Sequence, residues 1–467
     1  MESSSTIAGL PALEAAVTRD LTLLDYPRRE WVPPRSFGGG PILDVLIVGA
    51  GQSGVSTAFA LMREKVRNIL VVDQKPAGME GPWRDFARMV TLRTPKHVTG
   101  PDLGIPNLTF QAWYEAQYGA EGWTALKLIP KELWADYLAW YRRILGLPVR
   151  NGVKIGTLEW SAQAQAWKCP ATSPGGSEIF LARKVVLATG IDGAGRWESP
   201  PILDSVPRKF WSHTRDDIDF YALAGKEIGV LGAGASAFDN ASVALEVGAE
   251  VALFFRREKL VDINPYRWAE FTGFLKHHSD LDDAQKWTFI SQFVRMGQLP
   301  PADTLARARA HPGFSLHPGS PWTAVESAGD RVRVTTPRGS FEFDFLIVGT
   351  GFVTDLALRP ELAQVHEDIA LWRDKYTPPE TQRFDDLGRH PYLGPGGEFL
   401  PKAGKPWISS LFCYTYAGLP SLGFAGAFIS GLKYSLPKLV NSITGQLYRE
   451  DADHFFQALR DYDAKEF

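Results

Sequence analysis

The sequence carries two glycine-rich turns, each preceded by a short apolar run and followed by a helical pattern. The first turn, 49–54, reads Gly-Ala-Gly-Gln-Ser-Gly, and the second, 232–237, reads Gly-Ala-Gly-Ala-Ser-Ala. The apolar runs 45–48 and 228–231 before them are typical of buried strands. Glycines at such a turn let backbone amides approach a pyrophosphate, whose charge is favoured at a helix N-terminus. The pair therefore predicts an α/β protein with two Rossmann-like dinucleotide-binding domains.

Each glycine turn belongs to a strand–turn–helix–strand unit, and the residues at the end of the second strand differ in charge between the two units. The second strand of the first unit ends in Asp73, about 20 residues after Gly54, which is the spacing of a ribose-binding acid. The corresponding strand of the second unit ends in Arg256 and Arg257. A carboxylate accepts hydrogen bonds from ribose hydroxyls, whereas an arginine pairs with a 2′-phosphate. We therefore expect two different dinucleotides, FAD on the first unit and NADPH on the second, rather than two turns that bind nothing.

Composition narrows the class of protein. The chain has 467 residues, of which 45% are hydrophobic and 22% charged, as in soluble globular proteins with two or three domains. A net charge of −3 gives no general affinity for nucleic acid or for anionic membranes. No run of about 18 apolar residues predicts a membrane span, and the first residues lack the pattern of a secretion signal. We expect a cytoplasmic protein, and the sequence allows a homo-oligomer.

Other kinds of chemistry lack their sequence signals. The two cysteines, Cys169 and Cys413, lie far apart, so there is no CxxC pair for a dithiol redox mechanism. No His, Cys or Asp residues follow the spacing of metal ligands, and we predict no metal site. A GxSxG turn is absent, which leaves serine hydrolysis without support.

The order of the segments indicates nested domains. Each glycine unit is followed by hairpin-like segments and then by a strand that ends in Thr-Gly, at Thr189-Gly190 and at Thr350-Gly351. We expect the chain to cross between the domains there, with both nucleotides facing a shared cleft at the carboxyl ends of the strands. The predicted parts are an N-terminal arm (1–40), an FAD domain in two pieces (41–205 and 345–467) and an inserted NADPH domain (222–340).

Apolar periodicity predicts helices over 13–24, 130–145 and 235–247. The helix over 130–145 carries a stripe of aromatic residues, which we interpret as core packing. Another helix is expected after the segment 416–424 and up to about residue 443.

The chain resembles the class B flavoprotein monooxygenases, a superfamily of flavin-containing, N-hydroxylating and Baeyer–Villiger monooxygenases. The resemblance covers about 42–445, and the order and spacing of five motifs carry it. The motifs are GAGQSG with Asp73, Gly81-Pro82-Trp83, Ala188-Thr189-Gly190, GAGASA with Arg256-Arg257, and Gly349-Thr350-Gly351-Phe352.

The resemblance implies an oxidoreductase in which NADPH reduces FAD and the reduced flavin forms a C4a-(hydro)peroxyflavin with O₂ to oxygenate a small molecule. The segment 207–217 contains His213 but departs from the F-x-G-x-x-x-H linker of the Baeyer–Villiger enzymes. We therefore favour N-hydroxylation of an amine. Baeyer–Villiger or S-oxygenation, an NADPH oxidase or reductase without oxygen insertion, and a non-catalytic nucleotide sensor remain as alternatives.

The resemblance and the motifs together assign the candidate residues. For the reaction they are Arg93 and Lys96 in the segment 91–97, His213, and Asn264 after the second ribose strand. The alternative for the segment 91–97 is a charged surface loop, and the alternative for His213 is a hydrogen-bonded histidine at the domain junction. For Asn264 the alternative is a turn residue before a proline. For FAD they are Gly49, Gly51, Gln52, Ser53, Gly54, Asp73, Gln74, Trp83, Thr189 and Gly190, and for NADPH Gly232, Gly234, Ser236, Arg256, Arg257, Thr350 and Gly351.

Overall fold

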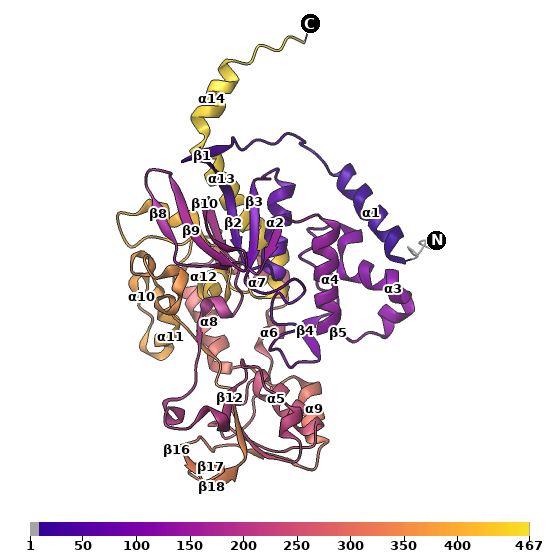
Figure 1. Cartoon of the computed structure of the whole chain (residues 1–467), viewed down its shortest axis with the longest axis vertical. Coiled ribbons are helices and arrows are strands. Elements are labelled where there is room, and N and C mark those ends of the chain that lie inside the picture. Colours follow the sequence, from indigo (N-terminus) through magenta and orange to yellow (C-terminus); the bar gives the residue numbers. More distant parts are fainter. Residues whose placement is uncertain (1–8, 467) are drawn as a thin grey trace.

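The computed structural model describes residues 9–466, which form two α/β lobes and a helical module beside the upper lobe (Figure 1). Each lobe contains one of the two glycine turns. The N-terminal arm passes over the upper lobe, so residues far apart in sequence meet there.

The first lobe is built on a mixed sheet in which the first glycine turn follows a central strand. The parallel strands lie in the order β6, β3, β2, β10 and β21 (Val149–Asn151, Ile69–Asp73, Gly40–Val48, Gly176–Leu187 and Leu411–Cys413). Antiparallel strands extend it, β1 on β2, β9 on β10, and β7 and β8 on β9 (Arg35–Phe37, Ala166–Ser173, Lys154–Ile155 and Glu159–Ser161).

Both faces of this sheet are covered, which is why its parallel strands are continuous apolar runs. On one face α2 (Gln52–Arg63) and α13 (Leu432–Glu450) pack over Val45, Ile47 and Val71. The alternate residues face a second core that is closed by C-terminal segments. The glycine turn and Asp73 therefore come to lie at the carboxyl edge of a rigid, doubly covered sheet.

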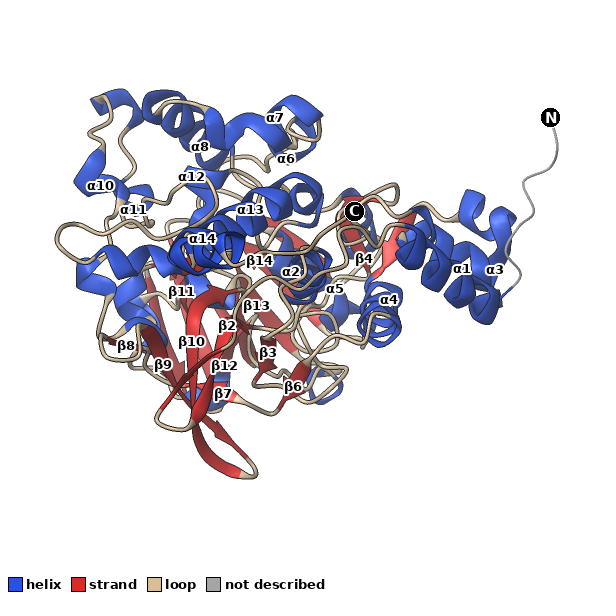
Figure 2. Ribbon diagram, turned by 90° about the horizontal axis from the view of Figure 1, so that it is seen from above, coloured by secondary structure: helices blue, strands red, loops and turns tan. Residues whose placement is uncertain are grey.

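A helical module stands to one side of the sheet (Figure 2). It consists of α1, α3 and α4 (Gly9–Leu23, Phe110–Ala125 and Lys131–Ile144) with the short strand pair β4 and β5 (Thr91–Pro95 and Leu128–Pro130). Its core is aromatic: Phe110, Trp113, Tyr137 and Tyr141 are all nearly inaccessible. The interpretation of the aromatic stripe as core packing is confirmed.

The second lobe carries the second glycine turn on a parallel sheet. Its strands lie in the order β12, β19, β13, β14 and β15 (Trp211–His213, Phe345–Val348, Glu227–Leu231, Glu250–Phe254 and Phe314–His317). Helices α5 and α9 (Ala235–Glu246 and Ala302–Arg309) contact each other beside this sheet. The antiparallel strands β16, β17 and β18 (Ala324–Ala328, Arg331–Thr336 and Gly339–Phe343) complete the lobe.

Between β14 and α9 the chain leaves this sheet and packs on the first lobe. It forms α6, α7 and α8 (Pro265–Trp268, Thr272–His277 and Asp283–Met296), which share a core with Trp372, Leu419 and Phe424. Two strands, β11 (Gly195–Trp197) and β20 (Phe352–Thr354), pair antiparallel just after the two Thr-Gly sequences. The lobes are thus joined by the paired linkers and by the packed helices.

The C-terminal part differs in detail from the predicted helix. After α10 and α11 (Trp372–Lys375 and Asp385–Gly388) comes the short α12 (Leu419–Leu422), and the long α13 begins only at Leu432. Residues 423–428 form a glycine-containing loop instead, in which Gly423 and Gly426 have φ angles of 68° and 56°, and a short 3-10 helix (Ile429–Gly431) follows it. The predicted helix therefore begins later and extends further, to Glu450.

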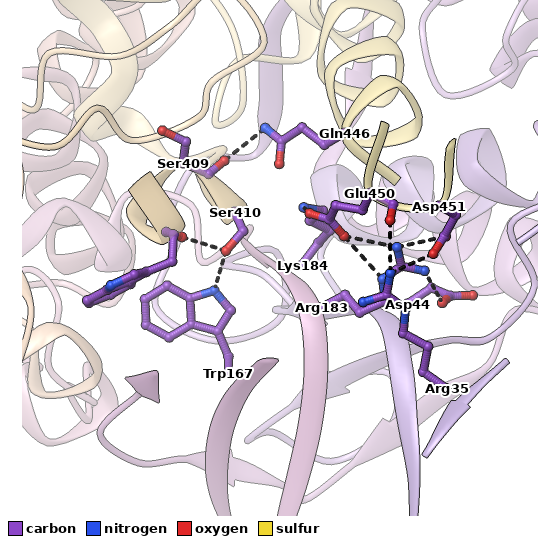
Figure 3. Close-up of polar contacts among 11 residues, drawn as sticks. Arg35, Asp44, Trp167, Arg183, Lys184, Ser409, Ser410, Gln446, Glu450 and Asp451 are labelled. Atoms are coloured by element: carbon purple, nitrogen blue, oxygen red, sulfur yellow. Dashed lines mark hydrogen bonds and ion pairs between the residues drawn. The ribbon is translucent and has the colours of Figure 1, made fainter. Parts of the chain in front are cut away.

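Buried charges join the sheet to α13 and to the C-terminal helix α14 (Ala452–Arg460), as Figure 3 shows. Arg183, 1% exposed, donates to Glu450 at 2.9 Å and to Asp451 at 2.8 Å, and its Nη1 lies 3.5 Å from the Asp44 carboxylate. Lys184 binds Glu450 from the next position on β10. Two adjacent basic residues of one strand thus hold the end of α13.

Candidate cofactor and substrate site

The first glycine turn has no room for side chains at two of its positions. A Cβ on Gly49 would lie 2.6 Å from the Ala188 carbonyl oxygen, and one on Gly54 would lie 1.8 Å from the Gly49 carbonyl oxygen. Asp73 is fixed beside this turn, because its carboxylate accepts from the amides of Ala50 at 2.8 Å and Lys75 at 2.9 Å. The acid and the turn therefore form one rigid unit at the carboxyl end of the sheet.

A cavity of about 350 Å³ opens next to this turn. Gly51, Glu80, Trp83 and Arg142 are among its lining residues. The indole Nε1 of Trp83 is buried and has no hydrogen-bond partner within residues 9–466. A Cβ on Gly51 would meet only the backbone of Gly81, at 3.7 Å. An orphan donor and open backbone in one cavity fit a group rich in acceptor atoms, as FAD is.

Two side chains predicted at the FAD site make internal contacts. The Gln52 amide oxygen accepts from the indole of Trp134 at 3.2 Å. The Ser53 hydroxyl donates to the carbonyl of Gly426 at 2.7 Å, which ties the first turn to the loop before α13. These side chains hold the walls of the site, and their backbone amides remain the candidates for contacts with phosphate.

The Thr-Gly sequence after β10 lies close by. The Thr189 hydroxyl is buried, and it too lacks a partner in the described part of the chain. The carbonyl of Gly190 accepts from the amide of Tyr416 at 3.2 Å. Gln74, in contrast, is exposed on the loop after Asp73. Thr189 thus offers a free hydroxyl, whereas Gln74 lies at the surface.

The second glycine turn repeats the pattern. Gly232 has a φ of 126°, and a Cβ there would lie 2.4 Å from the Gly349 carbonyl oxygen. A Cβ on Gly234 would meet nothing within 4 Å, so its backbone faces open space. Ser236 is exposed in the first turn of α5. The geometry suits a pyrophosphate at the N-terminus of α5.

The structure separates the two arginines that follow β14. Arg257 donates to the carbonyls of Met296 at 3.0 Å and Arg295 at 3.4 Å, at the end of α8. Arg256 is exposed and makes no ion pair or side-chain hydrogen bond with any residue from 9 to 466. Arg256 is therefore the better candidate for the 2′-phosphate.

We expect Arg256→Ala to raise the KM for NADPH by about 10- to 100-fold, since a hydrogen bond to a charged group contributes ~1.5–3 kcal/mol. The KM for NADH should stay nearly constant, because NADH has no 2′-phosphate. Steady-state oxidation of both nucleotides measures this, with Arg257→Ala as the matched variant of smaller effect. Equal losses for NADPH and NADH would contradict the role of Arg256.

Arg93 is the candidate catalytic residue that joins the two lobes. Its guanidinium donates to Asp239 of α5 at 3.0 Å, and Asp239 also accepts from the Thr304 hydroxyl at 3.0 Å. Burial raises the pKa of Asp239, while Arg93 beside it acts in the opposite direction. Arg93 itself stays 38% exposed in its side chain. It is a partly exposed cation held in place by a buried carboxylate.

Lys96, three residues later, points elsewhere. Its ammonium donates to the carbonyl of Trp123 at 2.5 Å and lies 4.6 Å from the centroid of the Trp123 ring. His97 packs edge-on against the same ring. The structure therefore directs these two residues into the helical module, and it does not bring Lys96 together with Arg93.

His213 lies buried at the end of β12, beside the linkers. Its Nδ1 accepts from the amide of Arg215 at 3.1 Å, and its Nε2 has no hydrogen-bond partner among the described residues. Burial lowers the pKa of His213, so the neutral ring predominates at neutral pH. The Thr350 hydroxyl donates to the carbonyl of Glu198 nearby. His213 thus has one free nitrogen at the domain junction, where Gly351 also lies.

Asn264 performs a local structural task. Its side-chain oxygen accepts from the amides of Tyr266 at 3.1 Å and Arg267 at 3.4 Å, which caps the short helix α6. The residue is exposed. Its side chain is oriented by the cap, as the turn alternative predicts.

Sequence reasoning missed an aromatic group between the lobes. The Tyr266 ring of α6 stacks on Phe424 at 5.3 Å, and Phe424 stacks on Phe428 at 4.7 Å. Tyr416 and Phe352 continue the group. The ring centroid of Tyr416 lies 5.6 Å from that of Phe428 and 4.9 Å from that of Phe352. These residues come from three distant segments. The one signal in the sequence was the aromatic run 416–428, and its partners could not be read from spacing.

Within residues 9–466, no three His, Cys, Asp or Glu side chains gather as metal ligands would. In the same range, every helix is too short or too polar to cross a bilayer.

Comparison with known proteins agrees with this architecture. The model of an FAD-NAD(P)-binding family matches residues 46–192. A protein of Xanthomonas campestris pv. campestris named FAD-dependent urate hydroxylase is 46% identical over 469 residues, covering 98% of this chain and 97% of that protein. The chain belongs to the family of this protein, within the class B flavoprotein monooxygenases. It is a flavin-dependent monooxygenase whose cofactors are FAD and NADPH, as the sequence predicts.

Solved structures show the same fold at low identity. The ornithine N-hydroxylase KtzI of Kutzneria sp. 744 has a TM-score of 0.66 and 15% identity, covering 87% of this chain and 100% of that one. The cadaverine monooxygenase DfoA of Erwinia amylovora has a TM-score of 0.64 and 16% identity, covering 86% and 95%. The predicted fold of two dinucleotide-binding domains is confirmed.

Proposed function

We propose that this enzyme hydroxylates urate or a closely similar purine anion, using NADPH and O₂. The observation that carries the proposal is the near full-length similarity, at 46% identity, to a protein named FAD-dependent urate hydroxylase. The N-hydroxylases share the fold at 14–16% identity, which supports the scaffold and not an amine substrate.

The candidate site suits a flat anion. Urate is planar and carries a negative charge near neutral pH. Tyr266 and Phe428 are partly exposed and stack on the buried Phe424, so they offer apolar surface, and Arg93 offers a cation with exposed N–H groups. Burial raises the pKa of Tyr266, so its hydroxyl remains a neutral hydrogen-bond donor. We assign these residues to substrate binding, and Arg93 to the substrate's negative charge.

The remaining residues have supporting roles in the proposal. Asp73 and the first turn hold FAD, which supplies hydride acceptance and oxygen activation when bound. Arg256 and the second turn hold NADPH. In the overall balance, one oxygen atom forms a bond to a ring carbon of the substrate and the other leaves as water. NADPH provides the two electrons, and solvent provides the proton.

The test is NADPH oxidation and O₂ uptake by the purified flavoprotein with urate, and with ornithine, lysine or cadaverine as controls. Urate is expected to accelerate both rates, to lose its ultraviolet absorbance and to give a product with one added oxygen atom. Acceleration by an amine alone, with hydroxylamine as the product, would favour the N-hydroxylation predicted from sequence. Peroxide release with no oxygenated product would indicate an oxidase.

We expect Arg93→Ala to raise the KM for urate by about 10- to 100-fold, the equivalent of a lost hydrogen bond to a charged group at ~1.5–3 kcal/mol. The KM for NADPH should change little. Arg93→Lys should recover part of the affinity, because it keeps the charge and loses the planar fork. Lys96→Ala, in the same segment but turned to Trp123, should have the smaller effect. An unchanged KM for urate in Arg93→Ala would contradict this assignment.

A further inference from the structure

The strand β4 of the helical module lies beside α5 and α9 of the second lobe (Figure 1). The Thr91 hydroxyl donates to Asp303 of α9 at 3.4 Å, and the Arg93 guanidinium donates to Asp239 of α5 at 3.0 Å. Helix α5 follows the second glycine turn directly. The side chain that we assign to the substrate's charge is therefore bound by the lobe that we expect to hold NADPH.

Asp239 is held in a fixed position on α5. Its side chain is 4% exposed, and its other carboxylate oxygen accepts from the Thr304 hydroxyl at 3.0 Å. Thr304 is itself buried, and its carbonyl accepts from the Ser242 hydroxyl at 3.2 Å. Among residues 9–466, Arg93 is the only cation within ion-pair distance of this carboxylate. Asp239 therefore gives Arg93 one well-defined partner.

Arg93 depends on this carboxylate for its direction. Within the described chain, its guanidinium makes no other hydrogen bond or ion pair. Its side chain is 38% exposed, so several of its N–H groups remain free for a ligand. An arginine without a partner has many rotamers, and ordering it when a ligand binds costs conformational entropy. A residue that orders it beforehand lowers that cost.

The Arg93 guanidinium also lies near Tyr266, the first member of the aromatic group. Burial raises the pKa of Tyr266, and the positive charge of Arg93 acts on that pKa in the opposite direction. The cation is therefore within electrostatic reach of the phenol. Tyr266 belongs to α6, which lies between β14 and α9 in the chain and packs on the first lobe. The cation and the aromatic surface thus face one region between the lobes.

We propose that Asp239 is a positioning residue, which holds the Arg93 guanidinium in the direction from which it binds the negative charge of the substrate. This inference rests on the proposed function, in which Arg93 binds urate. Because the carboxylate is buried and the guanidinium is partly exposed, the substrate meets the guanidinium first. The second lobe in this way orients a substrate-binding residue of the first lobe.

The test is the steady-state KM for urate of the FAD-loaded full chain, with kcat and the KM for NADPH measured on the same preparations. Asp239→Asn keeps the shape of the side chain and an acceptor for Thr304, but it removes the charge. It should raise the KM for urate by about 5- to 20-fold, because the substrate must then order Arg93. The values of kcat and of the KM for NADPH should change little. In the Arg93→Ala background the same change should have no further effect, because Asp239 acts through Arg93.

Two further variants separate positioning from general packing of the lobes. Thr304→Val removes the hydroxyl that fixes Asp239 and should raise the KM for urate by a smaller factor. Asp303→Ala removes the other polar contact between β4 and the second lobe, and should leave the KM for urate unchanged. If Asp239→Asn is purified without FAD, Thr304→Val with and without Arg93→Ala decides the same question.

An unchanged KM for urate in Asp239→Asn would overturn the inference. A lowered KM would also overturn it, since the carboxylate would then compete with the substrate for Arg93. The same holds for an effect that persists in the Arg93→Ala background or appears equally in Asp303→Ala. A wild-type enzyme that urate does not accelerate has a different signature: it contradicts the proposed function, and this inference with it.

Discussion

Asp73→Ala is expected to give a folded protein that is purified with little or no FAD. The carboxylate is held at the first glycine turn by two backbone amides, at 2.8 and 2.9 Å, and we propose that its remaining acceptor capacity binds the ribose of FAD. Loss of one or two hydrogen bonds to a charged group costs ~1.5–3 kcal/mol each, which weakens FAD binding by about 10- to 10⁴-fold. The ratio of flavin to protein absorbance after purification measures the outcome.

Two controls separate a direct effect from misfolding. Gln74→Ala changes the next residue, which is exposed, and should keep its FAD. Binding of NADPH to the Asp73→Ala protein should persist, because the second glycine turn lies on a separate sheet. Full flavin occupancy in Asp73→Ala would contradict the assignment of this residue to FAD.

The parts of the fold that could be predicted are those with a local signal. Each glycine turn, its flanking strands and the charge that closes each unit lie within about 30 residues of sequence. Tight packing imposes the glycines, as the 1.8 Å approach of a Cβ on Gly54 to Gly49 illustrates. The two-lobed architecture follows from the repetition of this unit.

The parts that could not be predicted depend on contacts between distant segments. Arg93 and Lys96 are equivalent as charged residues in one segment, yet one meets Asp239 of α5 and the other meets Trp123. Arg256 and Arg257 become distinct only because the carbonyls at the end of α8 bind Arg257. The local sequence does not specify which distant residue each of these charged side chains contacts.

Substrate specificity also depends on contacts between distant segments, and therefore has no local signal in the sequence. Motifs for FAD and NADPH are shared by enzymes that act on amines, sulfides and ketones, so they leave the substrate open. The side chains that we assign to the substrate, Arg93, Tyr266 and Phe428, come from separate elements and carry no motif. The similarity to a protein named FAD-dependent urate hydroxylase, which covers 98% of this chain, is therefore the basis of the substrate that we propose.

Arg183→Ala is expected to lower the free energy of unfolding by about 3–5 kcal/mol, since it leaves buried carboxylates without their partner. The side chains of Arg183, Asp44 and Asp451 are 1%, 3% and 4% exposed, so water cannot replace the lost contacts (Figure 3). Urea titration followed by tryptophan fluorescence, in the FAD-loaded protein, measures the change. Arg150→Ala removes the exposed pair with Glu178 and should cost at most about 1 kcal/mol.

The pH dependence of stability gives an independent view of the same cluster. Burial raises the pKa of Asp44 to about 6, whereas the unfolded chain has the ordinary value of 3.8. Between these values the folded protein holds a proton that the unfolded chain releases, so this group makes stability fall as the pH rises from about 4 to 6. Asp44→Asn cannot titrate and should flatten that part of the profile. If the profile of Asp44→Asn matches that of wild type, Asp44 does not titrate in this range and remains ionised within the cluster.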